Sequence, residues 1–285
     1  MGAAPWEQNR AASVCSNWPG CFFKVLLSSE EVPVEEKNLR RKSHVAECLS
    51  PRKSMRMVRA LVTGGSRGIG FEIAKGLIAN QIETTILGQD LSRVRSAADQ
   101  LGAAGIVCDV RDCDALLREK ERHQPFDLLV LSHGVMSEKM SKTMKATKDD
   151  WDRTIDINLT GVFNVVSIFG HELVEQRKGR VVVLSACLGR MSGPGNAGGL
   201  APYRISKAAV NAFVRNFAHE TGLGSRGVLV DAICPGHCQT DMGGPDAPRT
   251  AAEGAETAIW LATRAFTPGV DLTGLLWEDK EIVPW

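Results

Sequence analysis

The 285-residue chain carries 34 Lys and Arg against 33 Asp and Glu, so its formal net charge is +1. Such a balance offers no field to hold nucleic acid or an anionic membrane, and no apolar run reaches the roughly 20 residues that a membrane helix needs. With 44% hydrophobic and 24% charged residues, we expect a water-soluble globular protein with neither nucleic acid nor membrane insertion.

Residues 1–56 show no sustained period of 2 or 3.6, so we interpret them as an N-terminal extension, either disordered or targeting. Lys24 interrupts the apolar run CFFKVLL, which argues against a secretory signal. Glu7 is the sole acid of residues 1–29, which keeps organelle targeting open for that part. Otherwise we expect a cytoplasmic location, with the folded domain at residues 57–285.

From residue 58 onward, short apolar runs alternate with helical spacing. Runs typical of strands cover residues 58–63, 83–88, 104–110, 126–132, 180–186, 227–236 and 272–277. Helical spacing covers residues 71–80, 91–101, 114–123, 149–176, 202–222 and 250–266. This alternation predicts a single doubly wound, Rossmann-type α/β domain with a seven-stranded parallel sheet covered on both faces.

The eight cysteines show no CxxC pair and no regular framework. Several lie in apolar runs such as GIVCDV, where a free cysteine behaves as a small buried hydrophobe, and this favours a reducing compartment. Cys234, His237 and Cys238 lie close together, but no second ligand pair of suitable spacing accompanies them. We therefore predict no metal site.

Two short motifs carry the chemistry. TGGSRGIG, residues 63–70, lies between the first strand and the first helix, where glycines let the backbone turn under a pyrophosphate. Tyr203, the only tyrosine, lies four residues before Lys207, so a helix places both on one face. A neighbouring ammonium lowers the pKa of a phenol, which suits Tyr203 to proton exchange.

Together with Asp109 in CDV, Asn158 in INLTG and the run PGHCQTDM, these motifs resemble the short-chain dehydrogenase/reductase family over residues 58–285. The runs around PYRISKAAVNAF and EGAETAIWLAT look most like its carbonyl reductases. The resemblance implies that Tyr203 donates a proton to a carbonyl oxygen as hydride arrives from the nicotinamide. It implies that Lys207 binds the nicotinamide ribose and lowers the pKa of Tyr203, and that Asn158 supports a water in the proton path. The positions expected to contact the cofactor are Gly64, Ser66, Arg67, Gly68, Ile69, Gly70, Gln89, Asp109, Val110, Tyr203, Lys207, Pro235, Gly236 and Thr240.

Cofactor choice depends on charge at the end of the second strand, where a carboxylate accepts the ribose hydroxyl of NAD and repels the 2′-phosphate of NADP. Gly88 takes that place and Gln89 follows it, while Arg67 can bond a 2′-phosphate. Asp90, one step further on, is the opposing charge. The balance favours NADP over NAD.

The chain departs from the family pattern in two places. The usual Asn-Asn-Ala-Gly is replaced by residues 131–134, in which Ser132 is expected to steady the sheet and His133 to be a packed residue. Ala186 stands where the family has its carbonyl-orienting serine. The adjacent Ser185 is our candidate replacement, provided that the strand end bulges or twists, because successive strand side chains face opposite ways. Ser192 in the following loop is the other candidate.

We therefore expect an NADPH-dependent reductase of a small-molecule ketone or aldehyde, with residues 237–250 as a substrate lid. One alternative is a 3-oxoacyl-[acyl-carrier-protein] reductase, although no basic run lies beside the lid to attract an acidic carrier. Another is a weakly active or non-catalytic nucleotide-binding protein, because Ala186 replaces serine. The presence of Tyr203, Lys207 and Asn158 together favours an enzyme. The sequence leaves open the substrate, the direction and whether the protein is a homo-oligomer.

Overall fold

The computed structural model describes residues 57–137, 142–193, 198–267 and 270–285, and the predicted extension, 1–56, lies outside them. Within these residues one sheet runs in the order β3-β2-β1-β4-β5-β6-β7-β8. Its strands are β1 (Arg59–Thr63), β2 (Glu83–Gly88), β3 (Ala104–Val107), β4 (Leu128–Leu131), β5 (Gly179–Leu184), β6 (Val228–Ile233), β7 (Leu276–Glu278) and β8 (Glu281–Val283). The first seven pair in parallel, which confirms the predicted doubly wound sheet.

The eighth strand adds to the prediction, because β8 pairs antiparallel with β7 at the sheet edge. The turn between them places Asp279 and Lys280 at φ of 51° and 65°. Two consecutive residues with positive φ are typical of the tight turn that matches the twist of a β-hairpin. The sequence did not predict this hairpin, because Asp279 and Lys280 are not the glycine or asparagine that usually marks such a turn.

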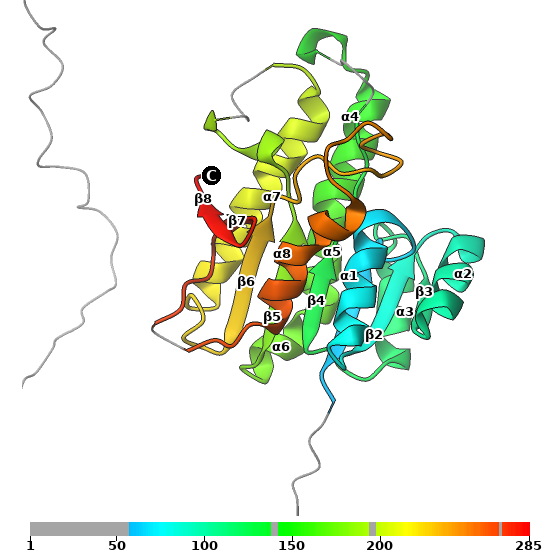
Figure 1. Cartoon of the computed structure of the whole chain (residues 1–285), viewed down its shortest axis with the longest axis vertical. Coiled ribbons are helices and arrows are strands. Elements are labelled where there is room, and N and C mark those ends of the chain that lie inside the picture. The colour runs from blue at the N-terminus through cyan, green and yellow to red at the C-terminus, as the bar shows by residue number, and fades with distance from the viewer. Residues whose placement is uncertain (1–56, 138–141, 194–197, 268–269) are drawn as a thin grey trace, which may run out of the picture. The chain divides into compact units, whose positions relative to one another are not determined.

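Helices cover both faces of the sheet (Figure 1). Buried side chains of α1 (Gly68–Ala79), α2 (Leu91–Leu101) and α8 (Ala251–Thr263) pack in one hydrophobic core. Those of α3 (Cys113–Arg122), α5 (Gly161–Phe169) and α7 (Ala201–Glu220) pack in a second core on the opposite face. Successive strand residues alternate between the two cores, with Leu61 in one and Val62 in the other, as expected for a sheet buried on both sides.

The long helix predicted for residues 149–176 is broken into α4 (Lys148–Ile155), a π-helical turn at Asp156–Thr160, α5, and α6 (His171–Glu175). Gly170 separates α5 from α6. A π turn widens the helix locally and often occurs at functional sites. Here it displaces Asn158 relative to a regular helix, and that residue lies fully buried beside α7.

Candidate functional site

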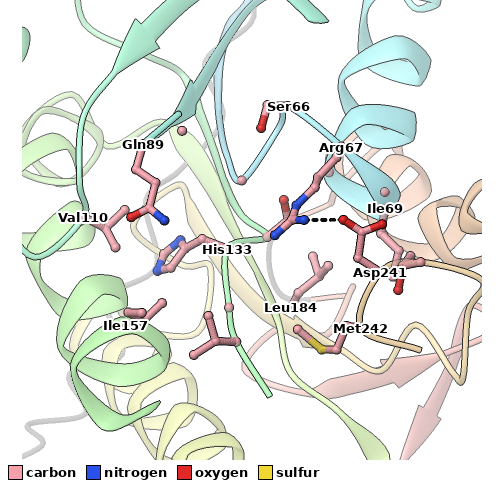
Figure 2. Close-up of a pocket in the computed structure, with 18 of the residues that line it drawn as sticks. Ser66, Arg67, Ile69, Gln89, Val110, His133, Ile157, Leu184, Asp241 and Met242 are labelled. Carbon is pink, nitrogen blue, oxygen red and sulfur yellow. Dashed lines mark hydrogen bonds and ion pairs between the residues drawn. The ribbon is translucent and has the colours of Figure 1, made fainter. Parts of the chain in front are cut away.

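A cavity of about 640 Å³ lies at the carboxyl ends of the parallel strands (Figure 2). Ligands of doubly wound folds bind at this edge, where the strand order reverses. Most of the predicted site residues line the cavity, and they come from the glycine turn, the strand ends, α7 and the loop after β6. They are Gly64, Ser66, Arg67, Gly68, Ile69, Gly70, Gln89, Asp109, Val110, Ser185, Tyr203, Lys207, Pro235 and Thr240. Gly236 and Asn158 are not part of this lining.

Some glycines of this turn are packed too closely to be replaced by residues with a side chain. Gly64 has φ of +68°, and a Cβ on it would lie 2.8 Å from the backbone nitrogen of His133. A Cβ on Gly70 would clash with the carbonyl oxygen of Gly64. Arg67, which precedes α1, provides no side-chain cap for that helix. The first amides of α1 therefore face a cavity without a protein cap, an arrangement that fits the phosphates of a dinucleotide.

The second strand ends beside a carboxylate that is already engaged. Asp90 caps α2, accepting hydrogen bonds from the backbone nitrogen of Arg93 at 2.9 Å and from Ser92 Oγ at 2.7 Å. The bond from the Arg93 amide, with that from Ser92, holds the pKa of Asp90 below its usual range. Gly88 leaves room beside Ser66, whose Oγ lies 3.3 Å from where a Cβ would stand. The Asp90 carboxylate is therefore used to cap the N-terminus of α2.

The opposite wall of the cavity carries Asp109 and His133. Arg111 Nη2 bonds Asp109 Oδ2 at 2.6 Å, and this bond lowers the pKa of the carboxyl group. His133 Nδ1 lies 2.6 Å from Thr63 Oγ1. Burial, together with the nearby Lys207 ammonium, lowers the pKa of His133 to about 3, so the imidazole is neutral at physiological pH. Ser132 Oγ donates to the carbonyl of Thr63 at 2.5 Å, tying β4 to β1.

Tyr203 and Lys207 lie on α7 at the cavity, and both side chains are buried. Lys207 Nζ lies 5.9 Å from the centre of the Tyr203 ring and donates to the carbonyl of Leu184 at 2.7 Å. Burial lowers the pKa of Lys207 to about 8. The pKa of Tyr203 is raised instead of lowered, first by burial and then by the thiols of Cys234 and Cys187. The prediction that Lys207 lowers it fails here because desolvation dominates.

Asn158 fastens the loop after β4 to α7. Its Oδ1 accepts from the backbone nitrogen of Val135 at 2.7 Å, and its Nδ2 donates to the Val135 carbonyl at 2.9 Å and to Ser206 Oγ at 3.0 Å. Ser206 Oγ in turn donates to the carbonyl of Tyr203 at 2.7 Å. In this structure Asn158 therefore positions the turn of α7 that carries Tyr203.

The structure does not bring Ser185 into the place of the missing serine. Its Oγ donates to Asn211 Oδ1 at 2.5 Å and lies 3.3 Å from the carbonyl of Lys207, so the hydroxyl faces α7. The bulge that this candidate would require is absent from the strand end, because β5 pairs with β6 in unbroken register and the Ser185 amide still bonds the carbonyl of Ile233. Ser192 Oγ, the second candidate, donates to the carbonyl of Trp285 at 3.2 Å.

The loop after β5 is pressed against α7. Ala186 is extended, with φ of −160°, and is followed by a 3₁₀ turn at Cys187–Gly189. A Cβ on Gly189 would lie 2.6 Å from the backbone carbonyl carbon of Lys207. Asn211 Nδ2 donates to the carbonyl of Gly189 at 3.2 Å. This loop and the helix that carries Tyr203 are therefore in direct backbone contact.

Sequence reasoning missed two contacts near the site. Arg67 forms an ion pair with Asp241, which lies in the predicted lid and lines the cavity (Figure 2). Cys187 and Cys234 meet beside Tyr203, although we treated such cysteines as buried hydrophobes. The signal for the first was the pair of opposite charges in two loops that both follow parallel strands. The second had a weaker signal, because both cysteines lie near the ends of predicted strands but nothing in the sequence indicates that those two strands are neighbours.

Comparison with known proteins identifies the family. A family model described as short chain dehydrogenase matches residues 58–250. The chain is 35% identical over 193 residues to oxidoreductase UcpA of Salmonella typhimurium, a match covering 64% of this chain and 70% of that protein. An actinorhodin polyketide ketoreductase solved with NADPH superposes with a TM-score of 0.67 at 26% identity, over 77% of this chain and 94% of that one.

A 3-oxoacyl-[acyl-carrier protein] reductase from Brucella melitensis, solved with bound NAD, also gives a TM-score of 0.67 at 26% identity, over 84% of this chain and 95% of that one. This chain belongs to the short chain dehydrogenase family. It is an oxidoreductase that acts on a CH–OH or C=O group with a nicotinamide cofactor. None of the helices in the described residues is long and apolar enough to cross a membrane.

Proposed function

We propose that the protein is an NADPH-dependent reductase of a small ketone or aldehyde, of the carbonyl reductase type. The observation that carries this proposal is the buried pair Tyr203 and Lys207, which lines the same cavity as the glycine turn. In this proposal the glycine turn is the cradle for phosphates, and the Tyr203 phenol with the Lys207 ammonium is the reacting part of the cavity. A bound nicotinamide cofactor would supply the hydride.

The glycine turn and the amides at the start of α1 would hold the phosphates of this cofactor, with Asp109 and Val110 beside the adenine. The preference for NADP is supported by Gly88, which offers no carboxylate, and by the engagement of Asp90 in capping α2. Arg67 and Arg93 both line the cavity near this strand end. Two guanidinium groups beside an engaged carboxylate favour a 2′-phosphate over a ribose hydroxyl.

Tyr203 would donate the proton to the carbonyl oxygen of the substrate. Its raised pKa keeps the phenol protonated at neutral pH, which is the form that a reductase needs before the step. Lys207, with a pKa of about 8, can exchange protons with water near neutral pH and help to return the proton to Tyr203. Asn158 would act through α7, by holding the turn that bears Tyr203.

The name of the Brucella relative favours 3-oxoacyl-[acyl-carrier-protein] reduction as a second candidate. The lid argues against it, because an acidic carrier needs cationic groups near the opening. Arg249, the only Arg or Lys of residues 237–250, is already bound to Asp279 through Nη1 at 2.7 Å and Nη2 at 2.5 Å. We therefore favour a small substrate.

The test is a screen of small ketones, aldehydes and 3-oxoacyl thioesters, with and without the carrier protein, following the loss of NADPH absorbance. We expect turnover with at least one small carbonyl compound. Tyr203→Phe should lower that turnover by at least about 10² and leave NADPH affinity nearly unchanged. Phe213→Leu, a change on the same helix at a partly buried position of the core, is the matched control. A protein that binds NADPH but reduces nothing would point to the nucleotide-binding alternative, and reduction of carrier-bound substrates alone to the second candidate.

A further inference from the structure

Two thiols meet where the central strands end. Because β5 and β6 pair with Leu184 opposite Ile233, the residues that follow them stay close together. The backbone nitrogen of Cys187 donates to Cys234 Sγ at 3.0 Å, and the two thiols are close enough to shift each other's pKa. The pair comes from two separate loops and lies beside neither the glycine turn nor the adenine wall.

The two thiols have different surroundings. Cys234 is 1% exposed, and its Sγ lies 3.4 Å from Glu278 Oε1. Cys187 is partly exposed and lies in the 3₁₀ turn before Arg190, whose guanidinium lies 3.9 Å from Glu278. One thiol is therefore reachable from solvent while its partner is buried behind it.

The charges around the pair favour a thiolate on the outer sulfur. The hydrogen bond from Cys234 lowers the pKa of Cys187 to about 6, with a smaller contribution from the Arg190 guanidinium. The pKa of Cys234 is raised, by the same bond and by burial, so this sulfur keeps its proton. Glu278 opposes ionisation of both sulfurs. A thiolate with access to solvent beside a protonated second thiol is the usual arrangement of an oxidation-sensitive pair.

A metal does not account for this cluster. Within the residues that the structure describes, no group of three or more His, Cys, Asp or Glu side chains is arranged to hold a metal ion. The pair also lies next to Tyr203, whose pKa both sulfurs raise. Oxidation of these sulfurs would therefore change the pKa of the proposed proton donor, Tyr203.

We propose that Cys187 and Cys234 form a peroxide-reactive thiol pair, with Cys187 as the attacking sulfur and Cys234 as the resolving one. The Cys187 thiolate attacks one oxygen of a hydroperoxide, the O–O bond breaks, and Cys187 becomes a sulfenic acid while the other oxygen leaves as hydroxide or alkoxide. The Cys234 sulfur then displaces the sulfenic hydroxyl, forming the disulfide and releasing water. The two thiols lose two electrons, which reduce one peroxide. This reactivity does not depend on the proposed carbonyl reduction.

The experiment uses the reduced full-length protein and hydrogen peroxide in slight excess. Aliquots are quenched with iodoacetamide at set times, and peptides are mapped by mass spectrometry. We expect a disulfide between Cys187 and Cys234 to form first, while Cys113, exposed at the start of α3, stays reduced as the control thiol within the chain. Cys234→Ser should leave a Cys187 sulfenic acid that dimedone traps, and Cys187→Ser should abolish the fast oxidation.

A second measurement needs no substitution and therefore no assumption about folding of the variants. In the unmodified protein, the alkylation rate of Cys187 should rise through about pH 6 and level off above it. At pH 7 it should exceed that of Cys113 by at least about fivefold. Alkylation of Cys187 no faster than that of Cys113, or a first disulfide that joins other cysteines, would overturn the proposal.

Discussion

The guanidinium of Arg67 forms an ion pair with the carboxylate of Asp241 at the cavity that both residues line (Figure 2). Arg67 belongs to the glycine turn, and Asp241 belongs to the predicted lid, residues 237–250. Both side chains are more than half exposed, so the pair adds little to stability. Its consequence concerns ligands, because an anionic group near Arg67 must compete with Asp241.

We expect Asp241→Asn to tighten NADPH binding by about threefold to tenfold, since Arg67 then loses its competing carboxylate. Asp246→Asn, an exposed change in the same loop, is the matched control and should have a smaller effect on NADPH affinity.

The unmodified protein should bind NADPH at least about tenfold more tightly than NADH, and Arg67→Ala should narrow that difference in affinity. Fluorescence titration measures each of these dissociation constants. Equal affinity for the two cofactors would refute the proposed preference.

The missing serine gives a separate prediction. Because Ser185 Oγ is bonded to Asn211, Ser185→Ala should lower the free energy of unfolding by about 1–3 kcal/mol, the cost of a buried partner left unsatisfied. The turnover of Ser185→Ala should stay close to that of the parent protein. Ala186→Ser should instead raise turnover, because it returns the hydroxyl that the family has at this position, and a typical donor of this kind contributes about 10²–10³. Urea unfolding and turnover with the best substrate are measured together. A large loss of turnover in Ser185→Ala at unchanged stability would contradict this assignment.

His133 predicts how stability depends on pH. Its folded-state pKa of about 3 lies below the ordinary value of 6.5, so between these values the unfolded chain binds a proton that the folded one does not. The contribution of His133 is therefore complete above about pH 6.5 and is lost as the pH falls toward 3. His133→Gln should make the unfolding free energy less dependent on pH in this window, by at most about 1.4 kcal/mol per pH unit. His219→Gln, an exposed change on α7, is the control. Parallel curves for His133→Gln and the parent protein would show that His133 has the same pKa in the folded and unfolded states, against this assignment.

The role of residues 1–56 is tested by truncation. We propose that residues 57–285 form the catalytic domain on their own, because the described residues after 57 already supply two extensive hydrophobic cores. A chain beginning at Met57 should unfold cooperatively and bind NADPH as tightly as the full chain. Calorimetry and fluorescence titration compare the two. Loss of the cooperative transition in the shorter chain would mean that the extension contributes to the folded domain.

The sequence was informative where local spacing determines position. The parallel strands, the glycine turn and the shared face of Tyr203 and Lys207 all follow from periodicity and from i, i+4 geometry. Side-chain partners across the fold could not be predicted in this way. The contact of Ser185 with Asn211 and that of Cys187 with Cys234 each depend on tertiary register. The raised pKa of Tyr203 was missed for the same reason, since burial depends on all the elements that surround the ring.

The close approach of Gly189 to Lys207 has a consequence for how the two sides of the cavity can move. The loop after β5 has no gap in which to shift against α7, because even a methyl group at Gly189 would collide with the helix backbone. The side of the cavity that carries Tyr203 should therefore be rigid. The predicted lid, residues 237–250, is bound to the glycine turn at Asp241 by a solvent-exposed ion pair, and we expect this side of the cavity to open. Substrate and product would thus exchange by a one-sided, hinge-like opening, with the proton donor fixed throughout the cycle.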